Sequence, residues 1–172
     1  MAQHIELNPL THFTINTVGE PGNRTFYMQG SMDGEQVSLV IEKAQAIALA
    51  DSFESLLGEL ERQYPELIDL DDKPQGIFNL QLRTPIDPLF RVGNLGLGFN
   101  EQVNRIVIVA YELVPEEEDP NVVSFWATPD QIKILVDHTQ GVVQSGRPIC
   151  GKCGDTIDPG GHFCAHRNGY IR

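Results

Sequence analysis

The chain has 172 residues, of which 41% are apolar, so it can bury one sizeable core but has no room for a second full domain. Aspartate and glutamate number 24 against 12 lysines and arginines, and the formal net charge of -12 repels phosphate backbones and anionic lipid over most of the surface. The composition therefore argues against nucleic acid and against a membrane as partners.

The N-terminal residues bear on location. The stretch MAQHIELNPL lacks the basic residues followed by an apolar run that mark a signal sequence. No apolar run in the chain approaches the length needed to cross a bilayer. We therefore expect a cytoplasmic protein.

The first part of the chain predicts three strands followed by one helix. Apolar and polar residues alternate around Phe13 and Ile15, and a Gly- and Pro-containing turn separates this stretch from the next alternating one. Apolar residues then recur at helical spacing, which predicts a helix. We expect this helix to end at Tyr64, because Pro65 restricts the residue before it and cannot continue the helix. The predicted elements are strands at 13–17, 24–29 and 37–41 and a helix over about 43–63.

An irregular connection over 65–88 follows, with an acidic cluster, several prolines and a pattern that allows one short strand at 78–82. The second part then repeats the order of the first. Its helix has the clearest start signal in the chain, because Thr128 can cap it, Pro129 suits the first helical position and Gln131 completes a capping box. The predicted elements are strands at 90–99, 105–114 and 122–127 and a helix from 129 to about 145.

The two parts resemble each other in sequence. When their strand-to-helix junctions are aligned, Gln45 falls on Gln131 and Leu49 on Leu135. This agreement predicts a duplicated βββα unit. The two copies would span about 11–63 and 89–145. Any protein with hairpins and two amphipathic helices could give similar matches, and that alternative remains open.

The predicted fold class is α+β. We expect antiparallel sheets from two βββα-like halves, with both amphipathic helices covering one face to form a single core. This domain would occupy residues 1–146, which we call the body. Residues 147–172, which we call the tail, would form a separate zinc-ribbon-like segment.

The tail contains all three cysteines of the chain. Cys150 and Cys153 form a C-x2-C pair, and His162 and Cys164 form a second short pair after an eight-residue gap. A Cys3His set with this spacing is typical of tetrahedral zinc, whereas a redox-active C-x2-C pair should lie between a strand and a helix. Four protein ligands leave no open position for a reacting water, so the sequence predicts a structural zinc ion as cofactor.

Three stretches of the chain resemble one bacterial protein family. They are Val18–Arg24 with Phe26 and Tyr27, Ser38–Gln45, and the tail motif from Gly146 to Tyr170. On these residues the chain resembles the domain-of-unknown-function 3090 family, which has a Cys-rich C-terminal motif. The resemblance implies a cytoplasmic bacterial protein and assigns no activity. Ala165 and His166 replace the Pro-Arg of the family pattern, which leaves open whether His162 or His166 is the fourth zinc ligand.

A second candidate site lies in the turn at 19–24. Gly19, Gly22 and Arg24 could bind an anion through exposed amides and a guanidinium. A plain hairpin turn with a surface arginine explains the same residues, and the turn lacks the lysine and the helix of a phosphate loop. Glu42 and Lys43, at the first strand-to-helix junction, could be a charged site pair or an ordinary helix start.

Three functions remain from these observations. The leading one is a protein-interaction module whose zinc-held tail contacts a protein partner. The alternative is an enzyme acting on a phosphorylated or other anionic small molecule near Arg24, and the second alternative is a zinc ribbon that binds nucleic acid. No Ser-His-Asp arrangement can be identified, so the sequence inclines against an enzyme. The basic residues Arg147, Lys152, Arg167 and Arg172 could dock the tail on the acidic body.

Overall fold

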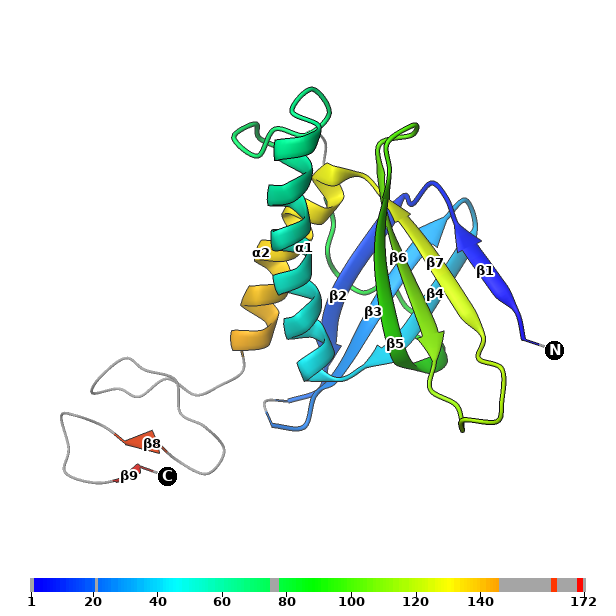
Figure 1. The fold of residues 1–172 in the computed structure, drawn as a ribbon. Coiled ribbons are helices and arrows are strands. Elements are labelled where there is room, and N and C mark those ends of the chain that lie inside the picture. The colour runs from blue at the N-terminus through cyan, green and yellow to red at the C-terminus, as the bar shows by residue number, and fades with distance from the viewer. Residues whose placement is uncertain (1, 21, 75–77, 146–161, 164–169, 172) are drawn as a thin grey trace.

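A computed structural model describes residues 2–20, 22–74 and 78–145, together with two short strands at 162–163 and 170–171 (Figure 1). Its larger elements follow the predicted order, with one additional strand at the start. The strands are β1 (His4–Leu7), β2 (His12–Val18), β3 (Thr25–Met32), β4 (Glu35–Ile41), β5 (Pro88–Asn100), β6 (Arg105–Glu112), β7 (Val122–Ala127), β8 (His162–Phe163) and β9 (Tyr170–Ile171). The helices are α1 (Lys43–Gln63) and α2 (Pro129–Gln144).

The first seven strands form one mixed sheet in the order β1-β7-β6-β5-β4-β3-β2, so the prediction of antiparallel sheets is wrong. Strand β5 pairs with β4 in parallel, with Val40 opposite Arg91, and β1 pairs with β7 in parallel. The first parallel pair arises because α1 returns the chain to the end at which β4 began. The second arises from β1, which the sequence pattern missed because only Leu7 of its four residues is fully buried.

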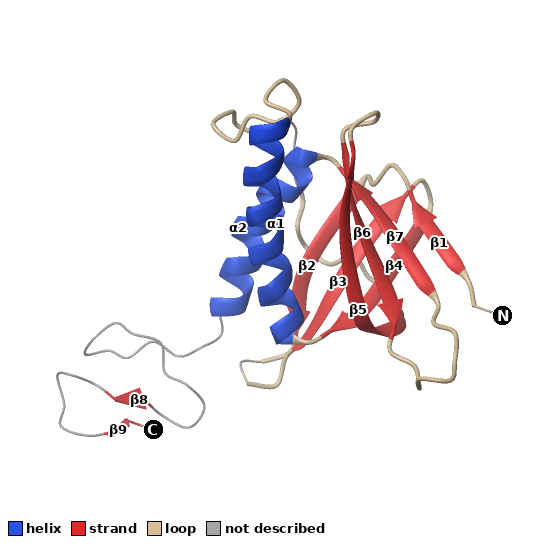
Figure 2. Ribbon diagram, viewed as in Figure 1, coloured by secondary structure: helices blue, strands red, loops and turns tan. Residues whose placement is uncertain are grey.

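Both helices pack against one face of this sheet (Figures 1 and 2). Leu49, Phe53 and Leu57 recur at helical spacing and form the buried face of α1. They belong to one core cluster with sheet residues such as Ile108 and with Leu135 of α2. The α+β body thus has its own hydrophobic core, with both helices on one face as expected. The zinc-ribbon-like part of the fold prediction is not seen, because β8 and β9 are the only described parts of the tail.

The sheet is strongly curved, and strands far apart in its order meet across the core. Phe13 of β2 stacks on Phe125 of β7, with ring centroids 5.2 Å apart. A Cβ atom on Gly30 would lie 2.7 Å from the Phe125 ring, so only glycine allows this approach of β3 and β7. The backbone N–H of Leu10 also donates to the carbonyl of Trp126 at 3.2 Å.

Candidate anion-binding site

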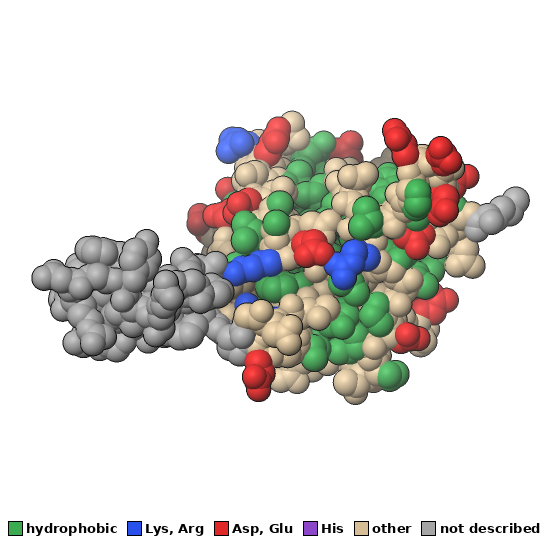
Figure 3. All heavy atoms as spheres, turned by 90° about the horizontal axis from the view of Figure 1, so that it is seen from below, with side chains coloured by type: hydrophobic (Ala, Val, Ile, Leu, Met, Phe, Trp, Pro, Cys, Tyr) green, Lys and Arg blue, Asp and Glu red, His purple; other side chains and the backbone are tan. Residues whose placement is uncertain are grey.

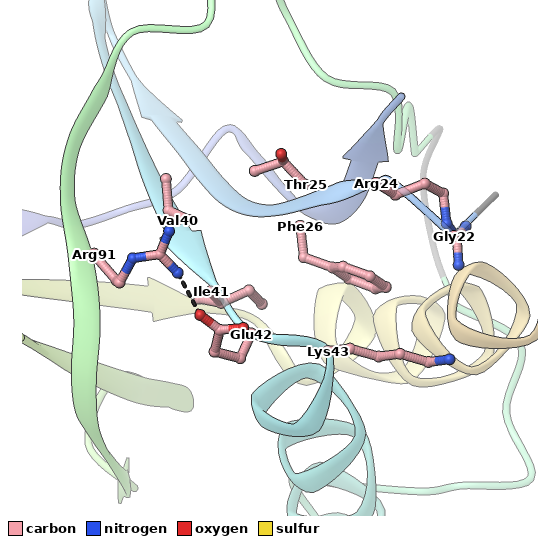
Figure 4. Close-up of a pocket in the computed structure, with 9 residues that line it drawn as sticks. All are labelled: Gly22, Arg24, Thr25, Phe26, Val40, Ile41, Glu42, Lys43 and Arg91. Carbon is pink, nitrogen blue, oxygen red and sulfur yellow. Dashed lines mark hydrogen bonds and ion pairs between the residues drawn. The ribbon is translucent and has the colours of Figure 1, made fainter. Parts of the chain in front are cut away.

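A pocket of about 410 Å³ lies at the carboxyl end of β4, where that strand passes into α1 (Figure 4). Four charged side chains line it, and we call it the basic pocket. Arg24 comes from the residue before β3, Glu42 and Lys43 from the junction of β4 and α1, and Arg91 from β5. The remaining lining residues are Gly22, Thr25, Phe26, Val40 and Ile41.

The start of α1 ties the two sides of this pocket together. The backbone N–H of Glu42 donates to Oε1 of Gln45 at 2.8 Å, which closes one half of a capping box. Nε2 of the same glutamine donates to the carbonyls of Val92 and Gly93, each at 3.1 Å. The first turn of α1 is therefore held against β5 just beyond Arg91.

Arg24 is held at the carboxyl end of α2. Its Nη1 donates to the carbonyl of Val142 at 3.0 Å and to Oγ of Ser145 at 3.3 Å. The guanidinium lies over the ring of Phe26, 5.2 Å from the centroid. Both hydrogen-bond partners are uncharged, so these contacts orient the guanidinium without neutralising it.

Arg91 and Glu42 form an ion pair across the other side of the pocket (Figure 4). Their side chains are 49% and 64% exposed, so the pair contributes little to stability. Lys43 and Arg24 extend toward α2, with Phe26 between them and the ion pair (Figure 4). Figure 3 shows this end of the molecule from below, with basic side chains on both sides of an acidic one. The pocket thus gathers three cations and one carboxylate in a protein whose net charge is -12.

Of the three residues predicted for an anion site, two line the basic pocket and one does not. Gly22 and Arg24 line the basic pocket. Gly19 instead shapes the turn, because its φ is +110° and a Cβ there would lie 2.6 Å from the carbonyl oxygen of Asn23. The sequence reasoning missed Arg91, since its place depends on the parallel pairing of β4 and β5. The charged pair noted at the strand-to-helix junction, Glu42 and Lys43, lies at the centre of the site.

The predicted zinc ligands fall almost entirely outside the described residues. Cys150, Cys153 and Cys164 are not among them, and neither is His166. Of His162 only the backbone is described, in the two-residue strand β8 that pairs antiparallel with β9. In the part of the chain that the structure describes, no group of three His, Cys, Asp or Glu residues is arranged to hold a metal ion.

A polar layer on the sheet holds the connection between α1 and β5. Residues 78–85, which we call the strap, contain no strand, so the strand predicted at 78–82 is absent there. Instead, strand side chains donate to strap carbonyls. Oγ1 of Thr14 donates to Leu80 O at 2.6 Å, and Nε2 of His12 lies 3.0 Å from Gln81 O.

His12 makes the stability of this layer dependent on pH. Burial, and then the charge of Arg83, lower the pKa of His12 below its ordinary value of 6.5, and strap carbonyls oppose the shift only in part. Below pH 6.5 the unfolded chain therefore binds more protons than the folded one, so the stabilising contribution is complete above that pH and is lost as pH falls through the folded pKa. Urea unfolding at pH 7.5 and pH 5 should show lower stability at pH 5.

The variant His12→Gln should show a smaller loss of stability between these two pH values. Burial also lowers the pKa of His138, so His138→Gln is the matched comparison and the two variants separate the contributions. An unchanged pH profile in His12→Gln would contradict the assignment.

One histidine and one serine meet outside the pocket. His4 Nε2 lies 2.7 Å from Ser124 Oγ between β1 and β7. Ser124 is only 5% exposed, so its hydroxyl is poorly placed to attack a substrate. This contact is a hydrogen bond that joins the parallel pair of strands.

These features define an α+β protein whose curved mixed sheet carries a basic pocket where β4 gives way to α1. Residues 5–164 match the family described as "Protein of unknown function (DUF3090)", and the chain belongs to this family. No curated protein and no solved structure matches the chain. Among the described residues, no helix is both long and apolar enough to cross a membrane.

Proposed function

We propose that this protein binds an anionic small molecule, with a phosphate or carboxylate group, in the basic pocket. The observation that carries the proposal is the convergence of Arg24, Lys43 and Arg91, which come from three separate parts of the chain. Arginine offers several N–H donors in a planar fork that matches phosphate and carboxylate oxygens. The volume of about 410 Å³ falls within the range of small-molecule sites.

The backbone supports the same assignment. The pocket lies at the start of α1, a helix of 21 residues, whose aligned peptide dipoles place partial positive charge there. The acidic remainder of the protein repels anions, so the local cations would have to hold the ligand at short range. We therefore expect binding to weaken as the salt concentration rises.

A thermal-shift screen with phosphate, pyrophosphate and sugar phosphates tests the proposal. A ligand that binds only the folded protein stabilises it by about 2.7 kcal/mol at a hundred times its Kd. The variant Arg24→Gln should weaken binding roughly tenfold, because one charge-assisted contact is lost.

Arg62→Gln is the matched control for that variant. Arg62 is exposed in the last turn of α1, and Lys43 is the first residue of that helix. The two residues are about 28 Å apart along the helix, at roughly 1.5 Å per residue. An unshifted melting temperature with every anion, or equal effects of the two variants, would refute the site.

We also propose that the tail binds one zinc ion through Cys150, Cys153, Cys164 and His162, with His166 as the alternative fourth ligand. The donor types and their spacing support a closed tetrahedral site. Thiolate ligands of this kind suit a reducing compartment, which supports a cytoplasmic location.

The second candidate function is contact with a protein partner through this tail. It is favoured by the charge of the tail, where Arg147, Lys152, Arg167 and Arg172 contrast with the acidic body. Affinity capture with and without a zinc chelator tests it. A partner set that does not change when zinc is removed would count against the tail as the contact surface.

A further inference from the structure

We infer that Glu42 makes the basic pocket selective for phosphate monoesters that also carry hydroxyl groups, such as sugar or polyol phosphates, over bare or alkyl phosphates. This inference rests on the proposed anion-binding function. It assigns Glu42 the role of a specificity-determining residue.

Positive charge is unevenly distributed in the basic pocket. Glu42 already neutralises Arg91 through their ion pair. Arg24 has uncharged hydrogen-bond partners, the carbonyl of Val142 and the hydroxyl of Ser145, and keeps its charge. The attraction for an anion is therefore strongest on the Arg24 side, toward which Lys43 also extends (Figure 4).

The Glu42 side of the pocket favours hydrogen-bond donors. An ionised carboxylate only accepts hydrogen bonds, and so do the oxygens of a dianionic phosphate. A phosphate beside Glu42 would be repelled, whereas a hydroxyl there could donate to the carboxylate. A ligand that fits this pocket therefore places hydrogen-bond acceptors near Arg24 and hydrogen-bond donors near Glu42.

The pocket is large enough for a ligand that contacts both sides. The pocket volume of about 410 Å³ exceeds the space that one phosphate group fills, so a ligand can reach from Arg24 to Glu42. Phe26 is only 5% exposed and offers little apolar surface to an alkyl chain. A polyol phosphate can add a hydroxyl donor to the carboxylate that already accepts from Arg91, whereas an alkyl phosphate offers it none.

Glycerol 3-phosphate and n-propyl phosphate form a matched pair of probes, since they differ only in two hydroxyl groups. Titration calorimetry on the full chain at low salt should give roughly tenfold tighter binding of glycerol 3-phosphate, the effect of a hydrogen bond to a charged group at a half-exposed site. The variant Glu42→Gln should bind the two probes with affinities within about threefold of each other. It should also bind n-propyl phosphate more tightly than the wild type, because Arg91 is released.

Glu59→Gln is the control, since Glu59 is an exposed glutamate further along α1 and should leave the preference unchanged. Equal binding of both probes by the wild type would overturn the selectivity and leave anion binding intact. A Glu42→Gln variant that keeps the wild-type preference would overturn the selectivity in the same way. Failure of both probes to bind the wild type would instead overturn the proposed function, and the selectivity with it.

Discussion

Replacing Cys150 and Cys153 with serine is expected to abolish zinc binding and unfold the tail while the body remains folded. The tail has few apolar residues to build a core, with Ile149, Ile157 and Phe163 the main ones. In small zinc modules the metal supplies folding free energy on the order of 10 kcal/mol. The described core, in contrast, runs from Leu7 to Val142 and is complete within the body.

Elemental analysis and hydrogen exchange check this expectation together. The wild type should hold one zinc ion per chain, and the double variant should hold none and lose exchange protection in the tail only. His162→Ala and His166→Ala form a matched pair, because only the true ligand should lower zinc affinity strongly. A tail that stays protected without metal would contradict the zinc proposal.

Local signals in the sequence defined most of the elements. The helix predicted over 43–63 is confirmed as α1, and the strand predicted at 122–127 is confirmed as β7. The cap of α2 is also confirmed, since the backbone N–H of Gln131 donates to Oγ1 of Thr128 at 3.0 Å. Periodicity and capping act over a few residues, so one sequence is enough to detect them.

Strand pairing could not be found in the same way. The strand beside which β5 lies depends on the path of the chain through α1 and the connection after it. The residues of β5 alone do not indicate that its neighbour is β4. Arg91 enters the basic pocket only through its register opposite Val40, so the sequence pointed to Gly22 and Arg24 and missed their partner. The strap was hidden for a similar reason, because its backbone bonds to side chains of strands that lie far away in the sequence.

The internal repeat gains a structural parallel and stays a prediction. Gln45 and Gln131 both close the cap at the third residue of their helix. Nε2 of Gln45 donates to β5 carbonyls, and Nε2 of Gln131 donates to the carbonyl of Leu10, just after β1. The strand β1 thus stands beside β7 as β5 stands beside β4. In the first predicted unit, the parallel neighbour of β4 is β5, which comes from the second unit. In the second unit, the short N-terminal strand β1 takes the corresponding place beside β7.

Replacing Gln29 with alanine should lower the free energy of unfolding by about 2–4 kcal/mol, because it removes a large buried side chain together with its three hydrogen bonds. Gln29 is fully buried on β3. Its Nε2 donates to Ser38 Oγ and to Arg83 O, each at 3.0 Å, and its Oε1 accepts from the backbone N–H of Arg83 at 2.8 Å.

Gln36→Ala is the matched control for Gln29→Ala. Gln36 also donates to the carbonyl of Arg83, at 3.3 Å, but it is exposed, so water can replace it and the cost should stay within about 0.5 kcal/mol. Urea unfolding measures both changes, and limited proteolysis should show earlier cleavage in the strap of Gln29→Ala alone. Equal costs for the two variants would mean that the strap is held by its other contacts with β2, through Thr14 and His12.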